Sequence, residues 1–282
     1  MLPLGILSGR LSAPIKNRMT AFPYKTWKEE FKIANNLGLT SIEWIFEHPN
    51  KSLNPICTKR GIKTLRELSA KYKIDINSIL AFNFLEDPLF NEKLINIKKS
   101  KQLINFLIDQ CFNIGIKMII LPLMGKNSIK EKSFQKELIA NISDNLDYAN
   151  KKKIKIIFEL DLTPNDYINF IHSINHSAVG INYDIGNSVI NGFNPIEEIN
   201  ELNKYILNVH IKDAIKNGYS VPLGEGEADF NQIFSLLKSN NYCGQYIFES
   251  ARQDSNNTKT NLDPFNTILI NINFINEIYS LS

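Results

Sequence analysis

The fold is decided by a repeating pattern that one stretch shows in full, KMIILPLMGKNSIKEKSFQKELIANISDNLDYANKKKIKIIFEL at residues 117–160. Two short runs, 117–123 and 155–160, are rich in Ile, Leu and Phe, which is typical of strands buried on both faces. Between them, 134–150 carries apolar residues three and four positions apart, the spacing of an amphipathic helix. The stretch therefore predicts two β-strands joined by an α-helix, as in a parallel sheet.

The same alternation extends through the rest of the chain. We expect eight strands at 4–8, 41–46, 76–82, 117–123, 155–160, 180–185, 206–212 and 245–250. We expect eight helices at 27–37, 64–73, 91–114, 134–150, 165–174, 195–205, 229–240 and 264–279. Eight such units in 282 residues predict an α/β fold, a (β/α)8 TIM barrel, as a single domain over 1–282. A doubly wound sheet is the alternative, but it normally has fewer strands and a Gly-rich first turn, which 8–12 does not provide.

Several helix boundaries carry recognisable signals. Thr163 and Asn194 each precede a proline, so their side chains are expected to cap the helices that follow. Asp229 stands in the corresponding place before Phe230. These signals support the predicted alternation of strands and helices.

Composition excludes several classes of function. Lys and Arg total 32 against 29 Asp and Glu, and the net charge of +3 is too small for a dedicated nucleic-acid or acidic-membrane surface. No window reaches the roughly 20 apolar residues of a transmembrane helix, and the first residues do not resemble a signal peptide. Three cysteines without a C-x-x-C argue against a disulfide framework. We therefore expect a cytoplasmic protein that binds neither nucleic acid nor membrane.

Metal-capable side chains come at the ends of four consecutive predicted strands. They are Glu159, Asp184, His210 and Glu249. The carboxyl ends of the strands carry the site in a (β/α)8 barrel, so these side chains are expected to converge at its mouth. A single acid at a strand end is more often a helix cap or a surface group. Chance does not account for metal-capable residues at the ends of four consecutive strands.

The chemistry of this set predicts one divalent metal ion. Three carboxylates and one imidazole favour Mn²⁺ or Mg²⁺, while Zn²⁺ and Co²⁺ accept the same ligands. Without a cation, three carboxylates in one dry barrel mouth would repel one another, which a metal ion would relieve.

Five segments carry a family resemblance: GILSGRLS at 5–12, LTSIEW at 39–44, NYDIGN at 182–187, VHIKD at 209–213 and PLGEGEADF at 222–230. They resemble the sugar phosphate isomerase/epimerase group of the xylose isomerase-like TIM barrel superfamily. The resemblance implies that the four strand-end residues bind the metal, which chelates adjacent carbonyl and hydroxyl oxygens of a sugar. It also implies that Glu159 and Glu249 face each other across the substrate carbon, where one removes a proton and the other returns it.

The implied activity is that of a metal-dependent sugar or sugar-phosphate isomerase or epimerase. Its proton transfer passes through an enediolate. A cation in contact with the enediolate oxygens stabilises their negative charge by roughly several kcal/mol. The expected partner is a small-molecule sugar or sugar phosphate. The oligomeric state is open, with a homodimer or a homotetramer as the expected forms.

Further residues are candidates for contact with the substrate: Arg10, Glu43, Asn187, Lys212 and Arg252. Arg10 follows the first strand and could hold a phosphate or a hydroxyl, although a surface role is an equal interpretation. Lys212 lies two residues beyond a predicted ligand and shares its face if the strand continues, or it pairs with Asp213 instead. Glu43, in the second strand, could orient a hydroxyl or a catalytic side chain.

Two positions depart from the pattern of relatives. Asn187 stands where some ketose epimerases have a histidine that touches the substrate, and Ala214 stands where relatives often have arginine. The sugar and its phosphorylation are therefore left open. A lone Gly-x-Gly at 224–226 is expected to shape the turn before the helix at 229–240 rather than to cradle a phosphate.

Three other functions share the fold or the site. A dehydratase of the inosose or dehydroshikimate type uses the same kind of metal and base. An AP endonuclease uses three metals and many histidines, whereas His210 is the one histidine placed at a predicted strand end. A non-catalytic sugar-binding protein has no need of all four metal ligands.

Overall fold

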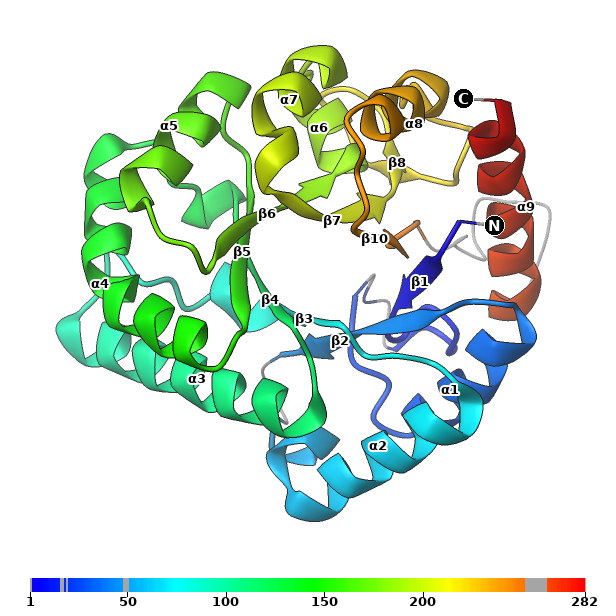
Figure 1. The fold of residues 1–282 in the computed structure, drawn as a ribbon, viewed down its shortest axis with the longest axis horizontal. Helices are drawn as coiled ribbons and strands as arrows, with labels where there is room; N and C mark the ends of the chain where they lie inside the picture. Colours follow the sequence, from blue (N-terminus) through cyan, green and yellow to red (C-terminus); the bar gives the residue numbers. More distant parts are fainter. Residues whose placement is uncertain (1, 16–17, 19, 48–50, 252–262, 282) are drawn as a thin grey trace. The chain divides into compact units, whose positions relative to one another are not determined.

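The computed structural model describes residues 2–15, 18, 20–47, 51–251 and 263–281. Its strands pair into a closed parallel barrel in the order β1-β10-β7-β6-β5-β4-β3-β2, and Figure 1 labels these strands. The predicted (β/α)8 TIM barrel is therefore confirmed. The barrel strands are β1 (Leu4–Leu7), β2 (Ser41–Phe46), β3 (Ser78–Ala81), β4 (Met118–Leu123), β5 (Lys155–Leu160), β6 (Val179–Asp184), β7 (Ile206–Ile211) and β10 (Gln245–Phe248).

The α-helices follow the strands along the chain. They are α1 (Trp27–Asn36), α2 (Lys59–Tyr72), α3 (Leu94–Ile114), α4 (Lys132–Lys151), α5 (Pro164–Ile174), α6 (Ile185–Asn191), α7 (Pro195–Leu202), α8 (Phe230–Ser239) and α9 (Pro264–Leu281). The residues divide into two compact units, one of Met1–Glu43, Leu68–Asp75 and Tyr183–Ser282, the other of Trp44–Glu67 and Ile76–Asn182. Among the helices of the described ranges, none combines the length and apolarity that crossing a bilayer requires.

The second of these units contains the stretch that predicted the fold. β4 and β5 pair in parallel over six positions, from Met118 opposite Lys155 to Leu123 opposite Leu160. Between them in the chain runs α4, which lies beside α3 on the outside of the strands (Figure 1). The side chain of Thr163 accepts a hydrogen bond from the backbone of Asp166, so the predicted cap of α5 is confirmed.

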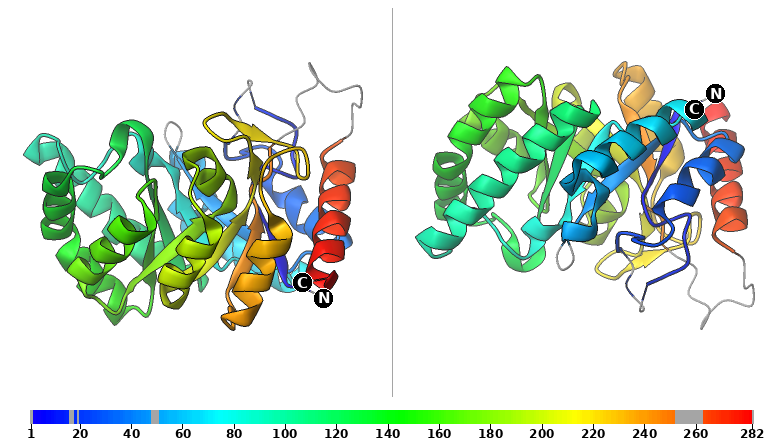
Figure 2. Two further views of the ribbon diagram at one scale, coloured as in Figure 1. Left: turned by 90° about the horizontal axis from the view of Figure 1, so that it is seen from above. Right: turned by 90° about the horizontal axis from the view of Figure 1, so that it is seen from below.

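In the first unit, β1 pairs with both β10 and β2, and β10 also pairs with β7. α8 and α9 lie side by side outside β10 (Figure 1 and Figure 2). The ring of Phe234 joins these elements, because it lies 5.4 Å from the ring of Tyr246 and 5.8 Å from that of Tyr279. The predicted caps Asn194 and Asp229 both accept backbone hydrogen bonds from their helices.

The helix α6 and the strands β8 (Asp213–Ala214) and β9 (Ser220–Val221) were not predicted from the sequence. The short helix α6 begins directly after β6, and Asp184 caps it by accepting the backbone N–H of Asn187 at 2.8 Å. A small antiparallel pair, β8 and β9, follows β7. Both lie close to strand ends that carry predicted metal ligands.

Candidate metal centre

The four metal-capable side chains are brought together by the structure. Each offers one ligand atom, and these atoms lie within 4.8 Å of one another. All four residues are buried: Glu159, Asp184, His210 and Glu249. The buried cluster suggests a site for a divalent metal ion.

The imidazole of His210 has a carboxylate at each ring nitrogen. Its Nδ1 lies 2.8 Å from Oε2 of Glu249 and 3.7 Å from Oδ2 of Asp184. Its Nε2 lies 2.8 Å from Oε1 of Glu43. Burial acts to lower the pKa of His210, but the charge of Glu43 and the hydrogen bonds to all three carboxylates raise it well above 6.5. A divalent cation at Nδ1 would compete with the proton that these carboxylates attract.

Glu249 directly follows β10, and its two oxygens face different partners. Oε2 meets His210, while Oε1 lies 3.9 Å from the Arg10 guanidinium. Burial acts to raise the pKa of Glu249, but the positive charges of Lys212, His210 and Arg10 hold it below its usual 4.5. This carboxylate is therefore ionised at neutral pH, as a metal ligand or a proton acceptor must be.

Asp184 is the last residue of β6, and its two carboxylate oxygens also contact different partners. Oδ1 accepts the backbone N–H of Asn187 at 2.8 Å, and Oδ2 accepts Nζ of Lys212 at 3.1 Å. The Lys212 ammonium also donates to Oδ1 of Asn187 at 3.2 Å. The stem of Lys212 crosses Gly186, where an added Cβ would lie 2.5 Å from Cγ of the lysine. A glycine at this position therefore lets Lys212 reach Asp184.

Glu159 is held within its own unit by a neighbour on the next strand. Oε2 of Glu159 accepts a hydrogen bond of 2.7 Å from Nδ2 of Asn182. Both side chains are buried. Asn182 was not singled out from the sequence, although it lies two residues before Asp184 and so on the same face of β6.

Arg10 is buried, with an exposed fraction of 6%. Its Nε donates to the carbonyl of Ser250 at 3.1 Å, and its Nη2 donates to the hydroxyl of Thr20 at 3.1 Å. Burial lowers the pKa of Arg10, against which the charges of Glu249 and Glu30 act. The guanidinium thus braces the chain just after Glu249.

The loop that carries Arg10 is itself anchored by a buried acid on α1. Both oxygens of Glu30 lie 2.9 Å from the backbone N–H of Gly9, and Oε1 accepts the hydroxyl of Ser12 at 2.8 Å. Sequence reasoning missed Glu30. The sequence signal that could have found it is a charged residue on the apolar face of an amphipathic helix, because Glu30 shares the buried face of α1 with Trp27 and Phe31.

Glu43 is fully buried and contacts protein groups. Besides His210, it accepts a hydrogen bond of 3.0 Å from Nδ2 of Asn208. Asn208 was also missed, and its signal was the two-residue spacing to His210 on one strand face. Arg252, the remaining candidate for substrate contact, lies outside the described residues.

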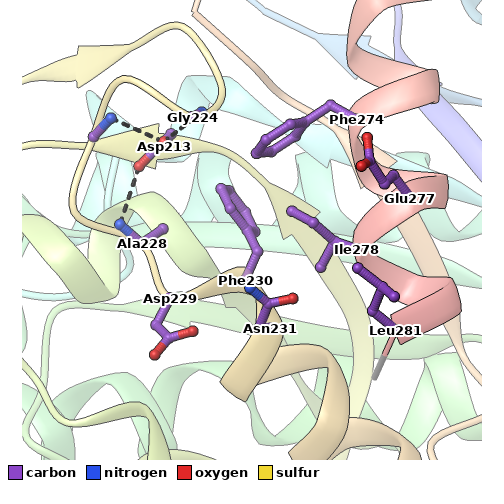
Figure 3. Close-up of a pocket in the computed structure, with 11 residues that line it drawn as sticks. Asp213, Gly224, Ala228, Asp229, Phe230, Asn231, Phe274, Glu277, Ile278 and Leu281 are labelled. Carbon is purple, nitrogen blue, oxygen red and sulfur yellow. Dashed lines mark hydrogen bonds between the residues drawn. The ribbon is translucent and has the colours of Figure 1, made fainter.

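The Gly-x-Gly at 224–226 folds around a carboxylate of the protein. The side chain of Asp213 accepts the backbone N–H groups of Ala214, Gly224, Gly226 and Ala228 at 2.9, 2.9, 3.0 and 3.2 Å. A Cβ at Gly226 would lie 2.1 Å from Oδ1 of Asp213. The expectation that this motif shapes the turn is therefore confirmed. Asp213 and this turn line a cavity of about 400 Å³. Figure 3 shows Asp213 and Gly224 on one side of this cavity and Phe230 and Phe274 across from them.

Comparisons with known proteins agree with this arrangement. Residues 31–271 match the model of a family described as the xylose isomerase-like TIM barrel. The chain is 23% identical over 261 residues to L-ribulose-5-phosphate 3-epimerase UlaE of Shigella flexneri serotype 5b, which covers 88% of this chain and 87% of that protein. It is 25% identical over 236 residues to an uncharacterized protein of Methanocaldococcus jannaschii, with 75% and 78% covered.

Solved structures show the same fold. D-psicose 3-epimerase with D-tagatose, from Clostridium cellulolyticum H10, superposes with a TM-score of 0.78 at 14% identity and covers 99% of each chain. The IOLI protein with a binding zinc atom superposes with a TM-score of 0.79 at 16% identity and covers 99% of this chain and 98% of that one.

Proposed function

Since the chain belongs to the xylose isomerase-like TIM barrel family, we propose that it is a divalent-metal-dependent sugar or sugar-phosphate isomerase or epimerase. The observation that carries the proposal is the buried set of three carboxylates and one imidazole whose ligand atoms lie within 4.8 Å. Relatives support it, because UlaE is an L-ribulose-5-phosphate 3-epimerase and a structure of the same fold is a D-psicose 3-epimerase.

The donor set fits a divalent cation. Buried carboxylates this close together repel one another, and a cation removes that conflict. The residues that would hold it are Glu159, Asp184, His210 and Glu249. Mainly oxygen ligands favour Mn²⁺ or Mg²⁺, and Zn²⁺ or Co²⁺ accept the same set. When bound, the cation polarises adjacent carbonyl and hydroxyl oxygens of a sugar and so acidifies the hydrogen on the neighbouring carbon.

The chain's own acids move the proton. One of Glu159 and Glu249 takes the proton from carbon to give an enediolate, and the other returns a proton to a carbon of that enediolate. Glu249 suits this role because the charges of Lys212, His210 and Arg10 keep it ionised. Return to the opposite face of the same carbon gives an epimer, and return to the neighbouring carbon gives an isomer.

Other side chains of the site bind the sugar. Lys212 and Asn187 lie beside Asp184 and offer an ammonium and an amide to substrate oxygens. Arg10 faces Glu249 and adds a positive charge on that side. Glu43 and Arg252 are the other candidates predicted from the sequence. We propose that the protein is cytoplasmic, that its substrate is a small-molecule sugar or sugar phosphate, and that it forms a homodimer or a homotetramer.

The test is hydrogen exchange at carbon. Protein loaded with Mn²⁺ in D₂O should incorporate deuterium into L-ribulose 5-phosphate or D-psicose, followed by NMR of the sugar. Glu159→Gln and Glu249→Gln should each abolish the exchange, because each loses the carboxylate that accepts or returns the proton. Glu137→Gln, at a half-buried glutamate of α4 outside the candidate site, should leave it unchanged. Exchange that continues after the metal is removed, or in both site variants, would sink the proposal.

A further inference from the structure

Glu43 lies in β2 with its side chain fully buried, and two donors from β7 fix its carboxylate. Oε1 is 2.8 Å from Nε2 of His210, and Oε2 accepts Nδ2 of Asn208 at 3.0 Å. Asn208 and His210 are two residues apart on one strand, so both side chains face the same way, toward Glu43. Both carboxylate oxygens are thus engaged by protein donors.

This contact determines which nitrogen of His210 can bind a cation. Each ring nitrogen of His210 faces a carboxylate, and a carboxylate accepts a hydrogen bond from a ring N–H. Glu43 is not one of the predicted ligands, so Nε2 keeps its hydrogen when a cation is bound, whereas Nδ1 gives up its hydrogen to bind the cation. Nδ1 is also the nitrogen that faces the carboxylates of Glu249 and Asp184. In metal sites, a carboxylate on the far ring nitrogen fixes the tautomer and the ring orientation, and raises the basicity of the ligand nitrogen.

We propose that Glu43 is a positioning residue of the metal centre, which holds the ring of His210 so that Nδ1 is presented to the divalent cation. The proposal rests on the metal-dependent function proposed above. It gives Glu43 a role other than contact with the sugar. Asn208 completes the arrangement by holding the second carboxylate oxygen.

Glu43→Gln tests this role with little change in volume. A glutamine amide is neutral and has one acceptor oxygen, so it accepts the N–H of His210 more weakly than the carboxylate does and does not raise the basicity of Nδ1. The affinity for Mn²⁺, measured by calorimetric titration of metal-free protein, should fall by about 10- to 100-fold.

Glu198→Gln is the matched control. Glu198 is also a buried carboxylate of the same unit, and it accepts hydrogen bonds from Tyr183 and Ser188, which are not among the predicted ligands. Its Mn²⁺ affinity should equal that of the wild type. An equal loss of affinity in Glu43→Gln and Glu198→Gln would overturn the specific role of Glu43.

The wild-type protein provides a second measurement that needs no variant. The chain has four histidines, so long-range ¹H–¹⁵N spectra of the Zn²⁺-loaded protein can separate their rings. We expect His210 to show a metal-bound Nδ1 and a protonated Nε2. The opposite tautomer, with the metal on Nε2, would overturn the proposal.

Two binding results separate the two proposals. Wild-type affinity for Mn²⁺ in Glu43→Gln overturns the role of Glu43 and leaves the proposed function standing. A wild-type protein that binds neither Mn²⁺ nor Zn²⁺ overturns both.

Discussion

Glu198 gives a quantitative test of how burial controls charge in this protein. Its side chain lies on α7, is 7% exposed and accepts hydrogen bonds from Tyr183 and Ser188. Burial raises the pKa of Glu198 from 4.5 to about 7, although the hydrogen bonds from Ser188 and Tyr183 act to lower it. In the folded protein this carboxyl therefore stays protonated at pH values where the unfolded chain has ionised it.

The pH window follows from these two values. Below pH 4.5 the group is protonated in both states and adds no pH dependence. As the pH rises toward 7 the unfolded chain ionises first, so the free energy of unfolding falls, and above pH 7 the loss is complete. At about 1.4 kcal/mol per pH unit, the loss amounts to about 3 kcal/mol.

Glu198→Gln removes this loss, because glutamine keeps the shape of the side chain and does not ionise. Urea unfolding should show that the variant gains about 3 kcal/mol over the wild type between pH 4.5 and about pH 8. Glu197→Gln, its exposed neighbour on the same helix, should change stability by less than about 0.5 kcal/mol at either pH. A difference between Glu198→Gln and the wild type that stays constant over this range would refute the reasoning.

Three other perturbations have expected outcomes. Gly186→Ala places a methyl group 2.5 Å from Cγ of Lys212 and should cost about 1–3 kcal/mol of unfolding free energy, so wild-type stability by urea titration would contradict the contact. Asp213→Asn leaves part of its set of backbone N–H groups without an acceptor and should cost about 2–5 kcal/mol. Faster hydrogen exchange at the Gly224 amide checks this, and unchanged exchange there would argue against it. Mn²⁺ at about 100 times its Kd should raise the unfolding free energy of the wild type by about 2.7 kcal/mol. Asp184→Asn should lose most of that gain in stability. Thermal unfolding measures both proteins, and an equal gain in the two would count against Asp184 as a ligand.

The barrel could be predicted because its strands are marked by composition alone. β4 and β5 read as nearly continuous Ile, Leu and Phe since both faces are buried, and the predicted bounds 155–160 coincide with β5. The strand predicted at 76–82 is shorter in the structure, because the chain turns into a short 3-10 helix at Phe82–Leu85. The helix α6 was not predicted, since seven residues that begin with Ile-Gly carry too little periodicity.

The sequence predicted which residues form the candidate metal site, but not which residues form hydrogen bonds with them. A strand end indicates where a side chain emerges, which is how His210 and Asp184 were found. It does not indicate which residue lies across the barrel. Glu43 meets His210 across 167 positions of sequence, and its second partner, Asn208, looks like an ordinary polar residue in a strand. Such partners follow from closure of the sheet, which no local pattern encodes.

The loop at 214–228 owes its path to main-chain amides gathered around the single carboxylate of Asp213. Its outward side chains contribute little to that path: Tyr219 is 69% exposed and Ile215 is 36% exposed. In such a segment, the path of the backbone does not depend on the exposed side chains. Directed evolution could therefore vary positions 215 and 219 to change which ligands the loop contacts, while Asp213, Gly224 and Gly226 preserve the conformation of the backbone.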